Sequence, residues 1–237
     1  MMKETLQKTL PAVCIAVGLV VLGWFLYTGI NHIAYRDRQV LVRGLAEREV
    51  MADKVTWPLV TQDLGNDLSA LYAQSENVNA KILAFLHAGG LSDNEISVNP
   101  PDVEDRLTQS YDPSRVTTRY KVTNVIVVTS SDVEKVRSLI KKQSELISQG
   151  IAVLAGDYNY PTTYEFTGLN GIKPEMIAEA THNAREAAAK FAQDSGSKLG
   201  DILTATQGQF SITDRDQYSP HIKNIRVVTN LSYYLED

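Results

Sequence analysis

The stretch Gly171–Gly200, GIKPEMIAEATHNAREAAAKFAQDSGSKLG, decides the fold because it predicts one long helix with a face of small residues. Apolar residues recur along it at spacings of three and four, as on one stripe of a helix: Met176, Ala180, Ala184, Ala187, Ala188 and Phe191. Pro174 suits the first helical turn, where its missing N–H is not needed, and Gly196 or Gly200 can end the helix. Because the stripe is mostly alanine, a β-sheet can approach the helix closely. The stretch therefore predicts a scaffold helix, and no reaction can be inferred from it.

Alternating apolar and polar residues predict strands before and after this helix. The predicted strands are Gln39–Gly44, Val55–Asp63, Glu95–Val98, Val116–Thr129, Ile151–Leu154, Thr162–Thr167, Asp201–Thr213 and Ile222–Leu235. The two most regular faces are Val116, Thr118, Tyr120, Val122, Asn124, Ile126 and Val128, and Ile225, Val227, Thr229, Leu231 and Tyr233. Pro58 places the second strand at an edge or marks a bulge, because proline donates no ladder hydrogen bond. Residues Asp102–Ser114 and Asp214–Pro220 are rich in polar and turn residues and predict loops.

Two further helices are expected among the strands. The first runs from 66 to 88, where Gly89 and Gly90 end it. Its apolar face comprises Leu68, Leu71, Val78, Ile82 and Phe85. The second begins at a capping box formed by Ser131 and Glu134 and reaches about Ser148. Helices interleaved with strand pairs predict an α+β domain, with long helices packed on a mainly antiparallel sheet.

The N-terminal stretch Leu10–Ile30, LPAVCIAVGLVVLGWFLYTGI, contains 21 residues without a charge. At ~1.5 Å per residue it crosses a hydrocarbon core of roughly 30 Å. An uncleaved signal anchor fits better than a cleaved signal, for which no A-x-A-like site follows. It also fits better than a lipoprotein signal, because the apolar run follows Cys14, and better than a buried core helix, which seldom reaches this length. We therefore expect a tail at residues 1–9, a transmembrane anchor at 10–30, a linker at 31–38 and one domain at 39–237.

Flanking charges give the orientation of this anchor. Lys3 and Lys8 precede the span, whereas Arg36 and Arg38 follow it with Asp37 between them. The positive-inside rule therefore favours a cytoplasmic N-terminus by a small margin. A large domain after a short N-terminal span is most simply an exported one. We expect a single-pass inner-membrane protein with its C-terminal domain in the periplasm.

Composition excludes several classes of function. The chain of 237 residues has a net charge of −5 and no basic stripe, which disfavours nucleic-acid binding. Its single cysteine, Cys14, lies in the apolar N-terminal stretch. The predicted domain therefore has no disulfide, thiolate metal site or cysteine nucleophile.

Short motifs follow one another in order from Val40 to the C-terminus. They are Val42-x-Gly44, Ala52-Asp53, Asn79-x-x-Ile82-x-x-Phe85-Leu86-x-x-Gly89-Gly90-Leu91, Glu95-Ile96, Tyr120-x-Val122-x-Asn124-x-Ile126-x-Val128, and Ala184-Arg185…Ala192…Gly196-x-x-Leu199-Gly200. In this order and spacing the chain resembles the SIMPL domain family of bacterial periplasmic and outer-membrane-associated immunogenic proteins. It departs from the family at Ala52 and Ala187, where proline and lysine are usual. The resemblance implies a non-enzymatic envelope protein, in a family whose members include proteins linked to envelope stress tolerance and proteins that form large oligomers.

One histidine has carboxylates at helical reach. His182 lies three residues after Glu179 and four before Glu186, although a metal site needs further ligands from elsewhere. A solvated helix face is the simpler interpretation. The remaining histidines are His32 beside the apolar stretch, His221 at the last strand, and His87, where a cation favours the helix end.

Two other groups of residues are candidate ligand sites. The carboxylates Asp102, Glu104, Asp105, Asp214 and Asp216 lie in predicted loops and can bind a hard cation loosely. Their spacing matches no EF-hand, so solvated turns are favoured. Gly168, Gly171 and Pro174 precede the long helix, whose N-terminus can hold phosphate. Neither a GxGxxG nor a GxxxxGK pattern occurs there, and no serine lies in a GxSxG elbow.

Aromatic and basic residues allow surface interpretations. The chain has 11 tyrosines, including Tyr158, Tyr160, Tyr164, Tyr233 and Tyr234. Exposed aromatics can serve a protein interface, whereas half-buried strand residues are the plainer interpretation. The cations of Lys135–Lys142 predict a solvated helix face.

No catalytic, cofactor-binding or metal-binding residue is predicted. We expect a structural or interaction module that can self-assemble into a homo-oligomer or bind another envelope protein. Two alternatives stay open. One is a periplasmic ligand- or metal-binding enzyme that uses His182 and nearby carboxylates. The other is an accessory subunit of a membrane complex that packs Leu10–Ile30 against partner helices.

Overall fold

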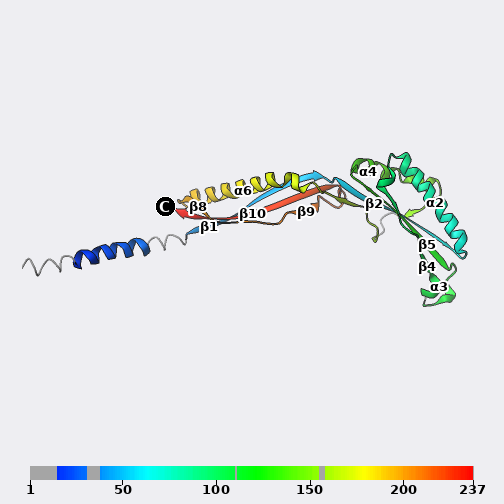
Figure 1. Cartoon of the computed structure of the whole chain (residues 1–237), viewed down its shortest axis with the longest axis horizontal. Helices are drawn as coiled ribbons and strands as arrows, with labels where there is room; N and C mark the ends of the chain where they lie inside the picture. Colours follow the sequence, from blue (N-terminus) through cyan, green and yellow to red (C-terminus); the bar gives the residue numbers. More distant parts are fainter. Residues whose placement is uncertain (1–14, 31–37, 110, 155–157, 237) are drawn as a thin grey trace, which may run out of the picture. The chain divides into compact units, whose positions relative to one another are not determined.

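The computed structural model describes residues 15–30, 38–109, 111–154 and 158–236 (Figure 1). The chain forms two compact units. The first unit comprises Met1–Glu47, Lys173–Ser211 and Arg226–Asp237, and the second comprises Arg48–Ile172 and Ile212–Ile225. Both combine helices with sheet, and the strand pairs β10–β8, β2–β5, β2–β6, β2–β7, β3–β5 and β4–β5 are antiparallel. The predicted α+β class with antiparallel sheet is confirmed.

The first unit is built on the strand order β1-β10-β8. These strands are β1 (Gln39–Met51), β10 (Ile222–Glu236) and β8 (Lys198–Gln207). The face predicted for β10 is confirmed, because Ile225, Val227, Thr229, Leu231 and Tyr233 are all buried. The single strand expected over 201–213 is instead two strands, β8 and β9 (Ser211–Asp214), and β9 also pairs with β10. Gly208 lies in the break between β8 and β9, and its backbone N–H donates to Val228 O at 2.7 Å.

Helix α6 (Leu169–Asp194) packs on this sheet through its alanine stripe (Figure 1). A Cβ built on Gly44 of β1 would lie 1.8 Å from Ala180 O and 2.7 Å from Ala184 Cβ. The Asn183 amide donates to Leu45 O at 2.8 Å. The helix backbone therefore rests directly on β1, as the small residues predict.

Three details of α6 differ from prediction. The helix begins at Leu169, so Pro174 lies inside it and not in the first turn. The buried stripe keeps a strict spacing of four: Met176, Ala180, Ala184, Ala188 and Ala192. Ala187 and Phe191 are exposed, because residues three positions along the helix rotate away from a close backbone contact. The helix ends at Gly196, whose φ of 71° is favourable only for glycine.

The second unit contains a six-stranded sheet with the order β3-β5-β2-β6; β4 also pairs with β5, and β7 with β2. The strands are β2 (Lys54–Gly65), β3 (Ile96–Val98), β4 (Asp102–Asp105), β5 (Tyr120–Ser130), β6 (Val153–Leu154) and β7 (Thr163–Glu165). The β2–β5 register runs without a break through Pro58, so there is no bulge. On its other side β2 pairs with β7 at 54–56 and with β6 at 60–61. Pro58 thus lies at a local edge between β7 and β6, which confirms one of the two roles predicted for it.

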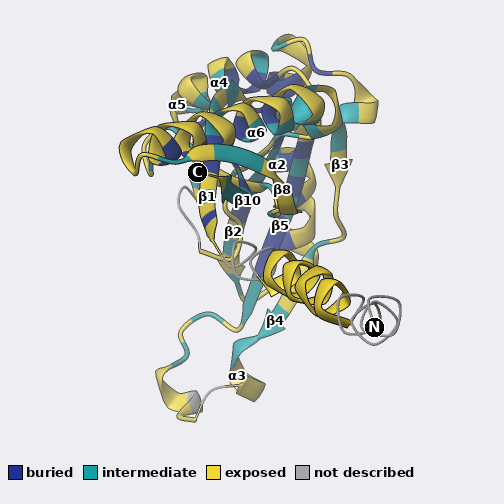
Figure 2. Cartoon of the chain, turned by 90° about the vertical axis from the view of Figure 1, so that its left-hand side faces the viewer, coloured by how far each residue is buried: buried dark blue, intermediate teal, exposed yellow. Residues whose placement is uncertain are grey.

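Helices α2 (Leu68–Ala88), α4 (Val133–Lys142) and α5 (Ser144–Ser148) contribute to the core of this unit. Its buried residues are Ala52, Val55, Trp57, Leu59, Ile82, Phe85, Leu86, Leu91, Ile126, Val128, Val133, Val136, Leu139, Leu146 and Ile151. Figure 2 shows β5 buried over much of its length, and the predicted inner face is buried at Val122, Asn124, Ile126 and Val128. The strand begins at Tyr120, so Val116 and Thr118, predicted on the same face, precede it. Leu68, predicted on the apolar face of α2, is exposed because the helix only begins there.

The helix caps are only partly as predicted. Asp132, rather than Ser131, caps α4 by accepting from Lys135 N at 3.0 Å. A capping box is present at Ser92 and Glu95, around the short η1 (Asp93–Glu95). Gly90 and Gly150 have φ of 83° and 79° at the predicted helix ends.

The stretch predicted as a loop, Asp102–Ser114, contains regular secondary structure. It contains β4, then α3 (Arg106–Gln109), and η2 (Pro113–Arg115) begins near its end. Charged pairs account for the extra strand, because Glu104 meets Lys121 at 2.9 Å across β4 and β5. Asp105 similarly meets Arg119 at 2.8 Å.

Residues 15–30 are helical, within the stretch expected to form the anchor. No helix in the described part of the chain is both long and apolar enough to cross a membrane. The predicted tail, the residues from Leu10 to Cys14, and linker residues 31–37 with His32 lie outside the described residues.

Candidate functional site

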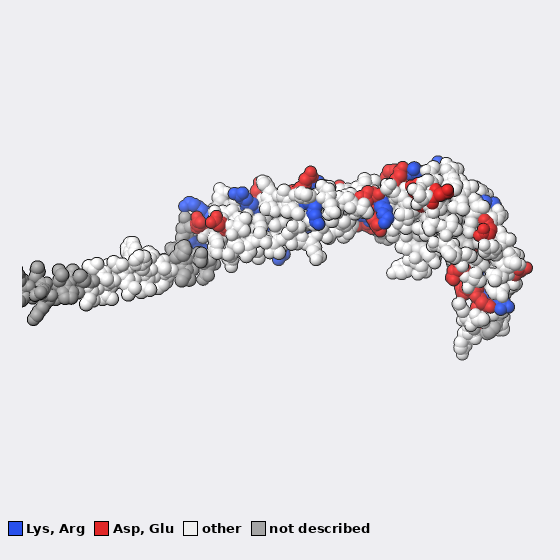
Figure 3. Space-filling view, viewed as in Figure 1, with Lys and Arg blue, Asp and Glu red and all other residues white. Residues whose placement is uncertain are grey.

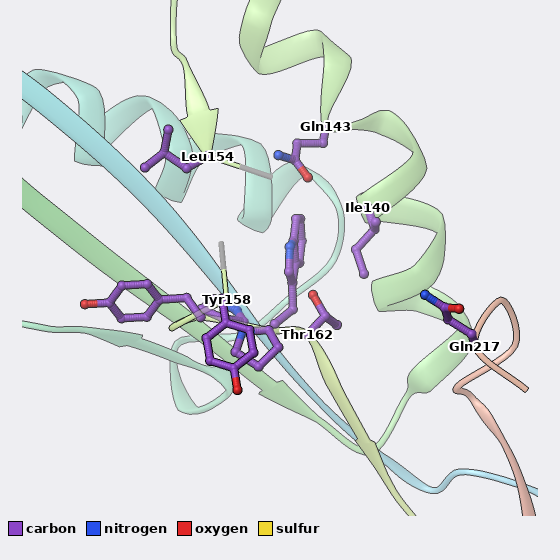
Figure 4. A pocket seen from close by; sticks show the side chains of 10 residues that line it. Ile140, Gln143, Leu154, Tyr158, Thr162 and Gln217 are labelled. Carbon is purple, nitrogen blue, oxygen red and sulfur yellow. The ribbon is translucent and has the colours of Figure 1, made fainter. Parts of the chain in front are cut away.

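A cavity of about 900 Å³ in the second unit, here called the β2 cavity, is one candidate site (Figure 4). It is lined by Trp57, Pro58, Ile140, Gln143, Leu154, Tyr158, Tyr160, Pro161, Thr162 and Gln217. The cavity lies where β2 has no strand neighbour between its pairings with β7 and β6. Figure 4 shows Leu154, Gln143, Thr162 and Gln217 disposed around it. Four segments distant in sequence therefore build one site.

The described residues that line the β2 cavity carry no formal charge. None of them is Asp, Glu, Lys, Arg or His. Trp57 is 3% exposed and forms a wall, whereas Tyr158 is 95% exposed. Among the described residues, none of the polar side chains in the lining has a hydrogen-bond partner. The cavity therefore combines aromatic and apolar surface with free hydrogen-bonding groups.

A second candidate is a polar cluster between α2 and the sheet. Thr61 and Asn124 are direct cross-strand partners, and Ser75 Oγ donates to Asn124 Oδ1 at 2.7 Å. Five buried side-chain atoms of the described chain have no hydrogen-bond partner. Thr229 Oγ1 lies in β10, and the other four belong to the second unit: Thr61 Oγ1, Asp63 Oδ2, Asn79 Oδ1 and Asn124 Nδ2. Burial raises the pKa of Asp63, although a hydrogen bond from Gln74 opposes this. The cluster contains both asparagines of the sequence motifs and holds one helix against two strands.

The three described histidines lie in separate environments. His182 Nε2 lies 3.7 Å from Glu186 Oε1, and both side chains are largely exposed. His87 is in the last turn of α2, as predicted, and its Nε2 lies 3.0 Å from Asp93 Oδ1. The rings of His221 and Tyr164 lie edge to face, with their centroids 6.1 Å apart. Burial lowers the pKa of His221. No three His, Cys, Asp or Glu side chains within the described ranges gather closely enough to hold a metal ion.

The acidic residues named from the sequence are mostly paired with cations. The hydrogen bond from Arg119 lowers the pKa of Asp105, and Glu104 pairs with Lys121. Asp214 pairs with Lys223. Asp216 lies 2.9 Å from Arg215, whose hydrogen bond lowers the pKa of Asp216. These four carboxylates stabilise strands and a turn. Asp102 is exposed in β4.

The start of α6 already has an anionic partner. Asp53 accepts hydrogen bonds from Thr167 N at 2.7 Å and Gly168 N at 2.8 Å. These are the backbone donors near Gly168, Gly171 and Pro174 that a phosphate would use. Sequence patterns did not single out Asp53 for this role, since the residue lies 114 positions before its first partner.

The remaining residues named from the sequence fall into different environments. Tyr158 and Tyr160 line the β2 cavity, Tyr164 is partly buried in β7, and Tyr233 is buried in the first unit. Tyr234 is half-buried in β10. In the basic helix α4, Lys135 and Arg137 pair with Asp132 and Glu134, so the expected solvated face is interspersed with acids. On the face drawn in Figure 3, acidic and basic side chains are mixed in the same way.

Sequence reasoning missed most of the lining of the β2 cavity. It named the two tyrosines, but not Trp57, Gln143 or Gln217. The one local signal was Pro58 within a strand, which indicated an interrupted edge. The other contributors are separated from β2 by 75 residues or more, so no spacing pattern joins them.

Comparison with known proteins places this geometry in a family. A β-ketoacyl-[acyl-carrier-protein] synthase III of Rickettsia typhi is 32% identical over 93 residues. That match covers 39% of this chain but only 27% of the enzyme's length, and it supplies no activity for this chain. The family model SIMPL, described as a protein of unknown function (DUF541), matches residues 40–225. Because that match spans both units and well over half of the chain, the chain belongs to the SIMPL family.

Proposed function

We propose that this protein is a non-enzymatic interaction module that assembles with copies of itself through the free edge of β8. The observation that carries this proposal is the exposure of that strand. Every residue from Asp201 to Gln207 is exposed, and Ile202 is 54% exposed. In the described chain β10 is the only strand that pairs with β8. The outer edge of β8 therefore presents unpaired backbone donors and acceptors.

The C-terminal part of this edge lacks the side chains that usually prevent strand pairing, whereas Lys198 and Asp201 lie in the first part of β8. Edge strands are typically protected by lysine, proline or inward-pointing charge. The segment Ile202–Gln207, ILTATQ, contains none of these residues. The register shifts between β10 and β8 fall at Ser232–Leu235, beside the start of this segment. Because these six residues carry no charge, two copies related by a two-fold axis can pair along them without like-charge repulsion and extend the sheet.

A groove beside β8 supplies further contact area. It has a volume of about 560 Å³ and is lined in part by Arg185, Ala189, Leu199, Ile202 and Tyr233. Helix α6 contacts the sheet at β1 through Gly44, and the half-buried and exposed residues of β8 form the other wall. Apolar side chains from a second copy would bury Ile202 here, which favours assembly.

The same proposal places the module at the inner membrane with its C-terminal domain in the periplasm. Its support is the uncharged run Leu10–Ile30 followed by a large domain. We also propose a role in envelope stress tolerance, which is supported only by the resemblance to the SIMPL family.

Cysteine cross-linking of the full chain in membranes tests the assembly. Cys14 is replaced by serine, and single cysteines are placed in turn at 202–207. We expect cross-linked dimers that peak at one or two neighbouring positions, since a two-fold axis brings only those residues together. The matched control is Tyr218→Cys, at a residue that is 91% exposed and lies outside β8. Absence of dimers at all six β8 positions, or equal dimer yield at 218, would refute the proposal.

A further inference from the structure

The turn that joins β9 to β10 meets two other segments at His221. The rings of His221 and Tyr164 of β7 lie edge to face, with their centroids 6.1 Å apart. The carbonyl oxygen of His221 accepts a hydrogen bond from Ala52 N at 2.9 Å, in the link between β1 and β2. All three segments belong to the second unit. His221 therefore connects the turn to β7 through its ring and to the β1–β2 link through its backbone.

The two segments that His221 contacts are themselves joined. Asp53 N, in the β1–β2 link, donates to Glu165 O of β7 at 2.9 Å. The Asp53 carboxylate accepts from Thr167 N and Gly168 N, which follow β7. The turn is thus attached to a surface that has its own hydrogen bonds. Loss of the His221 contacts would leave that surface in place and free the turn.

We propose that His221 is a pH-sensitive latch, which holds the turn 215–221 closed while its ring is neutral and releases the turn when the ring is protonated. This proposal does not rest on assembly through β8, which lies in the first unit. Histidine is the side chain whose ordinary pKa allows a change of charge between about pH 5 and 8. The geometry supplies the other requirement, a closed state that depends on a neutral ring.

The charged groups around the ring oppose its protonation on balance. Burial is the largest cause that lowers the pKa of His221, and the positive charges of Arg137 and Arg215 lower it further. Glu134 and Asp216 act in the opposite direction. However, Glu134 pairs with Arg137 at 2.6 Å and Asp216 with Arg215 at 2.9 Å. A protonated ring would therefore share both carboxylates with cations that already hold them.

The direction of the pH effect follows from these contacts. Burial raises the pKa of Tyr164, so its phenol stays neutral as the pH falls. An open turn returns the His221 ring to water, where its pKa approaches the ordinary 6.5. Opening of the turn therefore takes up a proton and becomes more favourable as the pH falls below 6.5. Above that pH the ring is neutral in both forms, and the latch has its full strength.

The latch also controls part of the β2 cavity. The turn contributes Gln217 to the lining of this cavity, whereas Tyr160 and Thr162 of the lining precede β7. Release of the turn removes Gln217 from the wall and leaves the other two residues in place. Acid should therefore widen the cavity, whatever ligand enters it.

Hydrogen exchange at Ala52 measures the latch directly, because the Ala52 N–H donates to His221 O. The full chain in detergent micelles is exchanged at about pH 7.5 and about pH 5, and the peptides that contain Ala52 are weighed by mass spectrometry. The rates are corrected for the intrinsic exchange rate at each pH. We expect a loss of protection at Ala52 at the lower pH. Peptides from Val122–Val128 of β5 should keep their protection, because the opening is local.

Three variants separate the latch from other effects of acid. His221→Gln is neutral at both pH values and should give equal protection of Ala52 at both. His221→Arg carries a fixed charge and should give low protection at both. His182→Gln removes an exposed histidine of α6 and should keep the pH dependence of the unmodified protein. Circular dichroism confirms that each variant is folded, and the comparison with His221→Gln decides the question even if His221→Arg does not fold.

Three results would overturn the inference. The first is equal protection of Ala52 at both pH values in the unmodified protein. The second is an equal loss of protection in His221→Gln, which would assign the effect to another group. The third is a loss of protection in the β5 peptides together with Ala52, which would show that acid unfolds the whole unit.

Discussion

Gly44→Ala is the sharpest test of the contact between α6 and β1. The added Cβ would lie 1.8 Å from Ala180 O and 2.5 Å from Ala184 N. Both are helix backbone atoms, so no side-chain rotation can relieve the overlap. Ordinary contacts to a Cβ begin near 3.4 Å, and the helix must therefore move away by more than 1 Å. Such a shift separates the apolar cluster of Val40, Ala184, Ala188, Leu231 and Tyr233.

The expected cost can be estimated from overpacked cores. Forced insertions in well-packed cores cost ~1–3 kcal/mol, and a clash with backbone belongs at the upper end, so we expect about 3 kcal/mol. For a chain of this size that corresponds to a fall of roughly 6–12 °C in the melting temperature. Urea unfolding of the full chain followed by circular dichroism measures the change.

A matched glycine substitution in α6 provides the control. Gly171 has no heavy atom within 4 Å of its added Cβ. Gly171→Ala should therefore stabilise the protein by about 0.5–1 kcal/mol, because alanine is the better helix former. The account of the α6–β1 contact is refuted if Gly44→Ala unfolds at the same urea concentration as the unmodified protein.

Three further substitutions test the second unit. Thr61→Val removes a buried hydroxyl that has no partner among the described residues and should raise the free energy of unfolding by about 1 kcal/mol; a loss of stability in urea would contradict this. Asp53→Ala removes the acceptor of two N–H groups before α6 and should cost about 2 kcal/mol, whereas an unchanged urea midpoint would show that the cap is dispensable. Glu95 has its pKa lowered from 4.5 to about 2 by hydrogen bonds from Ser130 and Ser92. Its carboxylate therefore stabilises the fold above pH 4.5, and this contribution is lost as the pH falls towards 2. The stability difference between the unmodified protein and Glu95→Gln should shrink over that interval, and a constant difference would contradict the assigned hydrogen bonds.

Local periodicity explains what the sequence predicts well. The buried faces of β5 and β10 follow an alternation of two, and the stripe of α6 follows a spacing of four. These patterns depend only on neighbours along the chain. Phe191 was assigned wrongly for the same reason, since a spacing of three also fits a helix. Only the close approach of Gly44 selects the strict spacing of four.

The sequence motifs act mainly on packing. Gly44 admits α6, and a Cβ at Gly89 would lie 2.2 Å from the Leu139 side chain in α4. Asn79 and Asn124 lie in the polar cluster beneath α2. These motif residues therefore contribute to the packing of the fold. The β2 cavity shares no motif residue, because its lining comes from segments that only tertiary structure brings together.

Cross-strand ion pairs explain why β4 was missed. Asp102–Asp105 is acidic and follows two prolines, which is typical of a loop. Its strand forms because Lys121 and Arg119 of the β5 region lie opposite Glu104 and Asp105. The partners of each ion pair are 14 to 17 residues apart in the sequence, whereas a periodic pattern relates only near neighbours along the chain.

The central proposal is assembly through β8, and molar mass tests it most directly. The full chain in detergent solution is measured by light scattering at several concentrations, with the detergent contribution subtracted. The same measurement is made on Thr204→Lys, which places a charge within the uncharged edge. The account predicts a defined multiple of the 26.2 kDa chain for the unmodified protein and a monomer for the variant. A monomer at every concentration, or the same multiple for both proteins, would contradict it.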